Sequence, residues 1–490
     1  MRQGPTAESQ GLFSMKRIAI IGGGITGLSA AYALETKRRA GVELEYSLYE
    51  SSPRFGGVLV TDQVDGCIIE AGPDSFLTEK PWASDLCTAL GLADQLIGSN
   101  DGDRITYILT GGKLIKMPDG LMFMVPTKIL PTILSPLFSL KTKLRMAREW
   151  FHPPQKANGD ESVASLVERH YGPEMVDLLA DPLLSGVYGG EASQLSVRAV
   201  LARFADMEAE HGSLGRAMLA ARKNAPQPGT GEPRPVFTSL KEGMQQMVDA
   251  LVARLPADSL NLGSLVQAVS HEGGGWIVSA GLQSDEFDAV ILALPTKAAA
   301  SLLRMSNPEL VAELSGVNYS SSVTVALGYD NHVRQSLPPG FGFLVPRSEG
   351  KRMLAATFVH NKFPHRAPDD RALLRCFLGG ARDEQILALP ENEILVMVRA
   401  ELKQILNLTT EPRFARVFKW KGAMAQYGVG HLERLQRIEA LRRKLPGLAL
   451  AGNGYSGIGV PDCVRSGTEA VEKTLQSLGI SESESLSTSS

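Results

Sequence analysis

The stretch RIAIIGGGITGLSAAYALE, residues 17–35, decides the fold. It joins a β-branched run to a Gly-x-Gly-x-x-Gly turn and a run of helix formers, which predicts the strand, turn and helix of a dinucleotide-binding unit. In such a unit Gly22 permits the tight turn, Gly24 lets the backbone approach a pyrophosphate, and Gly27 lets the helix pack closely on the strand. The phosphates are expected on the free N–H groups of the first helical turn, Ile25-Thr26 onward.

A second strand is predicted over residues 43–50, where apolar and polar residues alternate as far as Glu50, 23 positions after Gly27. A carboxylate at this place can accept hydrogen bonds from both hydroxyls of an unphosphorylated adenosine ribose. The following run, Ser51-Ser-Pro-Arg54-Phe-Gly-Gly57, adds a cation and a glycine pair, which favours FAD over NAD. Arg54 would reach a pyrophosphate or flavin oxygen, and the glycine pair would contact the ribityl chain or the ring.

Composition narrows the class of protein. The 490 residues are 43% hydrophobic and 21% charged, which is typical of a globular protein of two or three domains and excludes a disordered or fibrous chain. The formal charge of −3 gives no overall basic field, so nucleic acid is not expected as a partner. The four cysteines form no Cys-x-x-Cys pair and the eight histidines no ligand spacing, so no metal site is expected.

Residues 1–14 contain no apolar stretch of signal-peptide length, and residues 479–490 form a polar tail. A cytoplasmic location is therefore expected. Residues 121–140 are apolar, but Pro126, Pro131 and Pro136 would interrupt a spanning helix. Two readings of this segment stay open: a cationic, apolar surface that contacts a membrane or a greasy anionic ligand, or a buried loop-and-helix element. The flanking cations are Lys113, Lys116, Lys128, Lys141, Lys143, Arg145 and Arg148.

The remaining elements follow from local patterns. Residues 80–230 are mostly helical in pattern, with Ser162 to Tyr171 as an example. A helix is predicted from Leu240 to Leu255 with Ser239 as its N-cap, and another over 391–406. The predicted strands are Leu262–Val269, Trp276–Ala280, Phe287–Leu294, Val323–Tyr329, Arg352–His360, Leu373–Gly379 and the run starting at Leu448, which meets a glycine turn at Gly452 and then a helix from Val464.

Several motifs resemble a known superfamily. Glu50-x-x-x-Arg54-x-Gly56-Gly57 resembles the flavin amine oxidases, a group that includes monoamine oxidases, phytoene desaturases and protoporphyrinogen oxidases. Residues 69–76 (IEAGPDSF), 126–128 (PTK), 182–190 (PLLSGVYGG) and 457–463 (GIGVPDC) look like the soluble porphyrinogen oxidases of Gram-positive bacteria. The likeness extends from about residue 15 to about residue 478, with Ala425 standing where the family usually has proline.

The resemblance implies an α/β fold: a Rossmann-like FAD-binding domain with an inserted mixed-sheet substrate domain and a helical region. The FAD domain would comprise residues 15–80, 236–296 and 421–478. The substrate domain would have a helical part, residues 81–235, and a sheet part, residues 297–420. Lys80 and Gly186 would contact substrate. FAD would be held noncovalently, without a bond to Cys463, by Gly22, Gly24, Ile25, Thr26, Gly27, Glu50, Ser51, Arg54, Gly57, Val58, Gly72, Pro73, Asp74, Ser75, Val266, Trp420, Gly452, Ile458, Gly459 and Val460.

The activity that the resemblance implies is the six-electron oxidation of a porphyrinogen in haem biosynthesis. Coproporphyrinogen III is favoured as substrate over protoporphyrinogen IX, dioxygen would reoxidise the flavin to give hydrogen peroxide, and the next haem-pathway enzyme is a candidate partner. The flavin would carry the chemistry, so no catalytic side chain is assigned. Two rivals stay open: a flavin oxidase of amines or carotenoids, and a noncatalytic FAD-bound scaffold.

Overall fold

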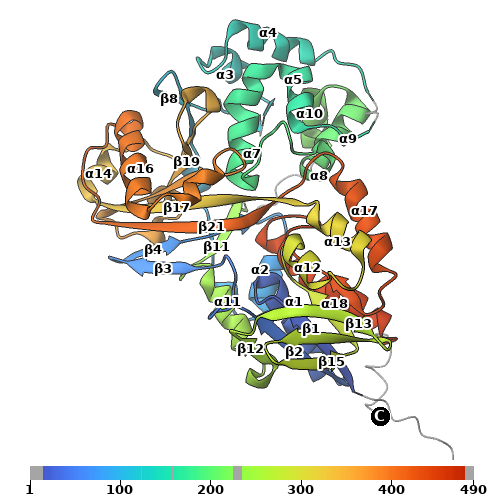
Figure 1. Ribbon diagram of the computed structural model, residues 1–490. Helices are drawn as coiled ribbons and strands as arrows, with labels where there is room; N and C mark the ends of the chain where they lie inside the picture. The colour runs from blue at the N-terminus through green and yellow to red at the C-terminus, as the bar shows by residue number, and fades with distance from the viewer. Residues whose placement is uncertain (1–14, 123, 156–158, 225–233, 481–490) are drawn as a thin grey trace, which may run out of the picture.

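The computed structural model describes residues 15–122, 124–155, 159–224 and 234–480 (Figure 1). At the lower end in this view lies a five-stranded sheet, of order β12-β2-β1-β16-β22, in which every neighbouring pair is parallel. Its strands come from three distant parts of the chain: β1 (Lys16–Ile21), β2 (Leu44–Glu50), β12 (Leu260–Leu262), β16 (Ala289–Leu292) and β22 (Leu448–Leu450). This is the open parallel sheet of a doubly wound nucleotide-binding fold.

Both faces of this sheet are covered, as a parallel sheet requires. Ile18 and Ile20 of β1 are fully buried against helices α1 (Ile25–Arg39) and α18 (Val460–Ser477). Ala19 and Ile21, whose side chains point the other way, pack in a second core with an antiparallel meander. The meander strands are β13 (Val266–Glu272), β14 (Gly275–Ala280) and β15 (Gln283–Phe287).

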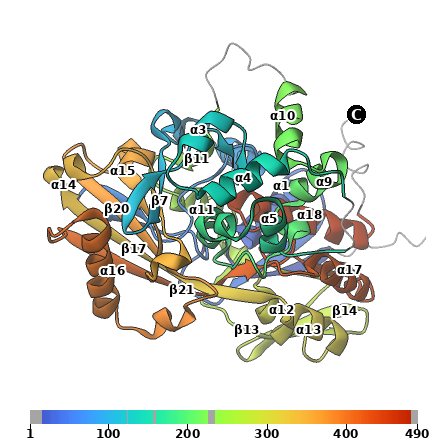
Figure 2. The ribbon, with the colours of Figure 1, turned by 90° about the horizontal axis from the view of Figure 1, so that it is seen from above.

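A larger sheet lies above the first (Figure 1) and has the order β21-β17-β20-β19-β18-β7-β8. It is mixed, because β18 pairs with β7 in parallel while the other neighbours are antiparallel. In the order of the sheet the strands are β21 (Phe414–Gln426), β17 (Asn318–Asp330), β20 (Arg371–Gly379), β19 (Met353–Phe358), β18 (Gly342–Leu344), β7 (Thr106–Thr110) and β8 (Lys113–Lys116). Viewed from above (Figure 2), α14 (Asn331–Ser336) and α16 (Glu391–Leu406) lie at one side of the molecule and α17 (His431–Arg442) at the other.

A group of helices caps the end of the molecule farthest from the parallel sheet (Figure 1). It comprises α3 (Ile129–Leu134), α4 (Leu140–Glu149), α5 (Val163–Tyr171), α7 (Asp181–Tyr188), α8 (Val197–Val200), α9 (Ala202–His211) and α10 (Leu214–Asn224). Apart from α3, these helices share one core around Leu166, Tyr171 and Leu179. Among the described residues, no helix combines the length and apolar character that crossing a bilayer requires.

The α/β expectation is confirmed, and the helix over 391–406 is observed with those bounds. The predicted helix Leu240–Leu255 is wrong at its start: Ser239 lies in strand β11 (Phe237–Leu240), which pairs with β5 (Phe76–Leu77) and β6 (Leu96–Gly98), and helix α11 begins at Gln245. The Ser239 hydroxyl donates to the carbonyl of Asp74 instead of capping a helix. The last helix starts at Val460, four residues earlier than predicted, with proline in its first turn.

Candidate functional site

The glycine turn after β1 has the geometry that its residues predict. Gly22 has a φ of +108°, and its N–H donates to the carbonyl of Tyr49 at 2.8 Å. A Cβ at Gly27 would lie 1.8 Å from the carbonyl oxygen of Gly22, so only glycine allows this approach of helix to turn. A Cβ at Gly24 would meet nothing within 4 Å, and no side chain caps α1. Open space therefore lies in front of the free N–H groups at the start of α1.

Glu50, at the carboxyl end of β2, ties the loops around this turn together. Its two carboxylate oxygens accept the N–H groups of Gly23 and Ser52, each at 2.7 Å. The backbone of Ser264, two residues before the buried Val266, donates to the carbonyl of Glu50 at 2.8 Å. Each carboxylate oxygen keeps a lone pair for a further donor, such as a ribose hydroxyl.

The loop after Glu50 folds back onto the glycine turn. The N–H of Gly56 donates to the carbonyl of Gly23 at 2.8 Å, and a Cβ at Gly57 would lie 3.3 Å from the Cα of Gly24. Arg54 braces its own loop, because its guanidinium donates to the carbonyls of Phe55 and Gly57. Burial lowers the pKa of Arg54, although the charge of Glu50 opposes this. The neighbouring Ser51 side chain is exposed and its hydroxyl lies 3.5 Å from the Glu50 carboxylate.

The turn Ala71–Asp74 packs directly against that loop. A Cβ at Gly72 would lie 1.9 Å from the carbonyl oxygen of Val58. The carbonyl of Ala71 accepts the indole N–H of Trp420 and the hydroxyl of Thr324, each at 2.8 Å. Trp420 of β21 and Thr324 of β17 therefore fix this turn to the large sheet. Pro73, within the turn, is half-buried.

Asp74 and Ser75 close the turn on the side of the large sheet. The Ser75 hydroxyl donates to the Asp74 carboxylate at 2.7 Å, and the Lys362 ammonium donates to it at 3.0 Å. Burial alone would raise the pKa of Asp74, but the charges of Lys362 and Arg375 outweigh burial and hold that pKa well below its usual range.

The turn after β22 completes the site. The N–H of Gly452 donates to the Ser466 hydroxyl at 3.0 Å, and the amide of Asn453 donates to the carbonyl of Ala423 on β21 at 2.9 Å. Ile458 and Gly459 lead into α18, where the Asp462 carboxylate of the first turn accepts the N–H of Gly459 at 3.2 Å. Because α1 follows β1 and α18 follows β22, both helices begin at the carboxyl edge of the parallel sheet.

The start of α1 also packs against α18, at the eighth residue of that helix. A Cβ at Gly467 would lie 2.3 Å from the carbonyl oxygen of Thr26, and Ile25 shares one core with Val460. The open space beside Gly24 therefore faces the uncapped N-terminus of α1, an arrangement suited to a pyrophosphate.

Lys80 and Gly186 lie in different surroundings. The Lys80 ammonium donates to both oxygens of Asp462, at 2.7 and 2.9 Å, and its side chain is 35% exposed. Gly186 is an exposed residue of α7, and a Cβ there would meet nothing within 4 Å. Tyr188, two residues on, lies edge-on to Tyr427 with ring centroids 6.4 Å apart. Burial, helped by the charge of Asp462, raises the pKa of Tyr188 to about 12.

Sequence reasoning did not single out Asp462, Thr324 or Arg375. Asp462 stands within the quoted motif 457–463, so its position was visible but its role was not. Arg375 is a charged residue inside the apolar strand run LLRCFL, a pattern that marks a buried, partnered charge. Across the residues with defined placement, no group of three or more His, Cys, Asp or Glu side chains could hold a metal ion.

Comparison with known proteins places this geometry in a family. The model of the flavin containing amine oxidoreductase family matches residues 25–475. The coproporphyrinogen III oxidase of Bacillus subtilis (strain 168) is 36% identical, over 94% of this chain and 98% of that protein. The coproporphyrinogen III oxidase of Propionibacterium freudenreichii is 31% identical, over 94% of this chain and 90% of that protein.

A solved structure agrees with these relatives. The crystal structure of a protein from Exiguobacterium sp. 255-15, provisionally named a protoporphyrinogen oxidase, superimposes with a TM-score of 0.84 at 30% identity. The match covers 95% of this chain and 99% of that one. UDP-galactopyranose mutase, at 16% identity and a TM-score of 0.69, shares the fold. The chain therefore belongs to the flavin containing amine oxidoreductase family and is a flavin-dependent oxidoreductase.

Proposed function

We propose that this protein binds FAD noncovalently and oxidises a porphyrinogen in haem biosynthesis, with coproporphyrinogen III as substrate and dioxygen as electron acceptor. The observation that carries the proposal is the uncapped N-terminus of α1, which faces open space at Gly24 after the first strand of the parallel sheet. Relatives named for coproporphyrinogen III cover 94% of the chain, which favours that substrate. Protoporphyrinogen IX is the alternative, since relatives of that name also match.

The chemistry of the donor set fits FAD. Glu50 has lone pairs for the ribose, and the backbone from Gly24 to Gly27 offers N–H groups for the pyrophosphate. Val266, two residues after the Ser264 that donates to the Glu50 carbonyl, is proposed to meet the adenine. Cys463 is buried, and burial raises the pKa of its thiol to about 11. At neutral pH this cysteine is a thiol and a poor nucleophile, which supports noncovalent binding.

In the proposed reaction the porphyrinogen loses three hydrides and three protons, and each reoxidation by dioxygen yields hydrogen peroxide. Bound FAD supplies the hydride acceptor. The protein's part is to orient the macrocycle and to exclude bulk water. Gly186 leaves one wall open to a flat ring, because no neighbouring atom lies within 4 Å of its Cβ position. Pyrrole N–H protons can leave as conjugation grows, so no side chain is assigned as a general base.

Lys80 is proposed to bind a substrate carboxylate. Two of its ammonium hydrogens point to Asp462, and the side chain keeps 35% of its surface exposed, so a third hydrogen can meet a propionate. Asp462 would then act as the residue that holds Lys80 in place.

A membrane-facing role is proposed for α3 and α4. Six apolar side chains on or beside these helices, which we call the apolar cap, are between 53% and 80% exposed: Leu130, Ile133, Leu134, Leu140, Leu144 and Phe151. Lys128, Lys141 and Arg148 are exposed among them. Apolar side chains ringed by cations suit the surface of an anionic bilayer, so we propose a cytoplasmic protein that docks there peripherally. The next haem-pathway enzyme is a second proposed partner.

The test of the oxidase function is the spectrum of the purified protein under anaerobic conditions. Coproporphyrinogen III should bleach the flavin band within one turnover, whereas amines and carotenoid precursors should not. Protoporphyrinogen IX, tested in parallel, decides between the two porphyrinogens by its relative rate. Bleaching by an amine alone, or by none of these reductants, would reject the proposal, the second result in favour of a scaffold.

A further inference from the structure

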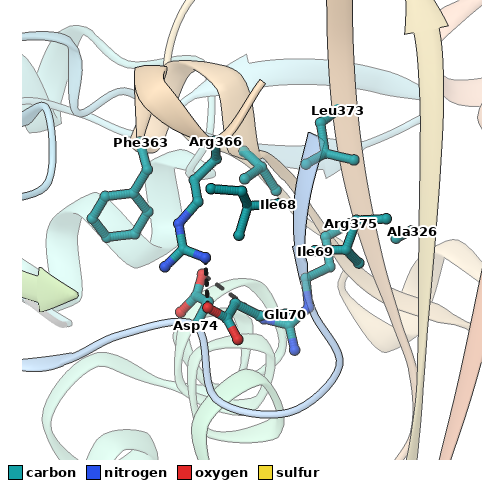
Figure 3. Close-up of a pocket in the computed structure, with 10 residues that line it drawn as sticks. Ile68, Ile69, Glu70, Asp74, Ala326, Phe363, Arg366, Leu373 and Arg375 are labelled. Carbon is teal, nitrogen blue, oxygen red and sulfur yellow. Dashed lines mark hydrogen bonds and ion pairs between the residues drawn. The ribbon is translucent and has the colours of Figure 1, made fainter. Parts of the chain in front are cut away.

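A buried group of charges lies behind the turn Ala71–Asp74, between it and the large sheet (Figure 3). We call it the turn cluster; its members are Glu70, Asp74, Lys362, Arg366 and Arg375. Three of them are almost completely buried: Glu70 is 5% exposed, Arg366 1% and Arg375 5%. Apolar residues around a small cavity, among them Ile69 and Phe363, separate these charges from solvent.

The charges of the turn cluster do not balance. It holds three cations and two carboxylates. Glu70 accepts the guanidinium of Arg366 at 2.5 Å, the N–H of Met244 at 2.7 Å and the hydroxyl of Thr61 at 2.9 Å. Burial raises the pKa of Glu70, but all three partners are donors, which favours a carboxylate paired with Arg366.

Asp74 is paired with Lys362 at 3.0 Å, which leaves Arg375 as the cation without a carboxylate of its own. A carboxylate oxygen of Asp74 lies 3.8 Å from the Arg375 guanidinium, beyond hydrogen-bond distance. An unbalanced charge at this depth is costly unless something facing it is negative or strongly dipolar.

Arg375 meets carbonyl dipoles of the turn, and its guanidinium carbon lies 4.8 Å from the centroid of the Phe377 ring. Its guanidinium donates to the carbonyl of Gly72 and lies 3.5 Å from that of Ala71. Its Nε finds no hydrogen-bond partner among the residues that the structure describes. Arg375 therefore contacts the turn from the side of the large sheet. At Gly72 the turn also packs against Val58, in the loop that follows Glu50.

We infer that Arg375 is a positioning residue for the flavin: it fixes the Ala71–Asp74 turn and supplies the positive charge that favours the reduced, anionic cofactor. The inference rests on the proposed function, because it requires the flavin ring to lie on the far side of this turn. Hydride transfer to a neutral flavin adds two electrons and one proton and so leaves one negative charge. A fixed cation behind the turn, in a medium of low dielectric constant, would stabilise that charge.

Thr324 separates the two parts of this role. Its hydroxyl donates to the same Ala71 carbonyl at 2.8 Å but carries no charge. Thr324→Val removes a contact to the turn and leaves every charge of the turn cluster in place. Arg366→Lys is the matched control for burial, because Arg366 is equally deep but donates to Glu70, Ser239 and the carbonyl of Leu240 rather than to the turn.

The experiment measures the two-electron midpoint potential of bound flavin in the holoenzyme, against a reference dye, for the wild type, Arg375→Gln, Arg375→Lys, Thr324→Val and Arg366→Lys. Arg375→Gln should shift the reduction equilibrium about tenfold toward oxidised flavin, about 30 mV for a two-electron couple. Arg375→Lys, which keeps the charge, should retain most of the wild-type potential. Thr324→Val and Arg366→Lys should leave the potential unchanged, although both lower the melting temperature.

Two results would overturn the inference. The charge is not responsible if Arg375→Gln and Thr324→Val shift the potential equally, and Arg375 has no role if Arg375→Gln binds flavin at the wild-type potential. Titration of flavin into the wild-type protein tests the proposed function separately from the role of Arg375. A wild type that takes up no flavin rejects the function itself, whereas a flavin-loaded wild type with an indifferent Arg375 rejects this inference alone.

Discussion

The ammonium of Lys80 lies 2.7 Å from one carboxylate oxygen of Asp462 and 2.9 Å from the other, although 382 positions separate the two residues. The pair joins the loop after β5 to the first turn of α18. Asp462 is 5% exposed at its side chain and also accepts the N–H of Gly459 at 3.2 Å. A residue proposed for substrate binding is thereby held by the same turn that is proposed to meet the flavin.

Lys80→Ala should raise the KM for coproporphyrinogen III about tenfold and leave kcat within a factor of about three. A hydrogen bond to a charged group contributes about 1.5 kcal/mol or more, and 1.4 kcal/mol is a factor of ten. Because the variant removes the closest cation from the buried Asp462 carboxylate and leaves only Arg465 at 3.8 Å, Lys80→Ala combined with Asp462→Asn should recover melting temperature but not KM. Lys113→Ala, at an exposed lysine of β8, serves as the control in steady-state assays. If Lys80→Ala lowers the melting temperature but leaves KM unaltered, the Lys80–Asp462 pair stabilises the fold and does not bind substrate.

Gly24→Asp should yield folded protein without FAD. Gly24 has a φ of −71° and open space at its Cβ position, so the backbone accepts an aspartate without strain. As an N-cap, the carboxylate would take the N–H groups of α1 and repel a pyrophosphate. The ratio of flavin to protein after purification measures the effect, and the melting temperature of the apoprotein should stay equal or rise.

Gly24→Asn is the matched comparison, since an asparagine caps the helix without a charge. We expect it to retain part of the flavin. Purification of Gly24→Asp with a full complement of FAD would show that the pyrophosphate lies elsewhere.

Local patterns predicted the parts of the fold that short segments determine. The strand, glycine turn and helix over residues 17–35 could be predicted because the β-branched run, the glycine spacing and the helix formers all lie within one short window. Ser239 shows the limit of such reasoning: a serine ahead of an apolar run looks like an N-cap, but pairing with β5 and β6 makes it part of a strand. Contacts between distant segments, such as Lys80 with Asp462 or Thr324 with the Ala71 carbonyl, depend on the register of the assembled sheets, which no window of sequence contains.

His170 should make stability depend on pH. Its imidazole is fully buried, and its two nitrogens lie 3.1 Å from Glu149 and 3.0 Å from Glu208. Burial lowers the pKa of His170, but the hydrogen bonds and charges of the two glutamates outweigh it and raise the pKa above 6.5. The stabilisation is therefore complete below pH 6.5, the value in the unfolded chain, and is lost as the pH rises through the higher value of the folded state. Each pKa unit between the folded and unfolded states corresponds to about 1.4 kcal/mol in the free energy of unfolding.

Urea unfolding at pH 6 and at pH 9 measures this dependence. The wild type should lose stability between the two, while His170→Gln should start lower and change less. His211→Gln, at a partly exposed histidine of α9, should follow the wild type. If the free energy of unfolding falls equally between pH 6 and pH 9 in the wild type and in His170→Gln, His170 binds no extra proton in the folded state.

Leu134→Glu combined with Leu144→Glu should weaken binding to vesicles of an anionic phospholipid about thirtyfold. The two side chains are 76% and 63% exposed in the apolar cap, so their replacement costs the folded protein little. At about 1 kcal/mol for each leucine that enters the interface, the loss is about 2 kcal/mol in the partition free energy. Val396→Glu is the matched control, because this valine is 67% exposed on α16, away from the apolar cap. Sedimentation with anionic and with neutral vesicles, at low and high salt, separates the apolar from the ionic contribution. Equal binding by the double variant and by Val396→Glu would rule out the apolar cap as the docking surface.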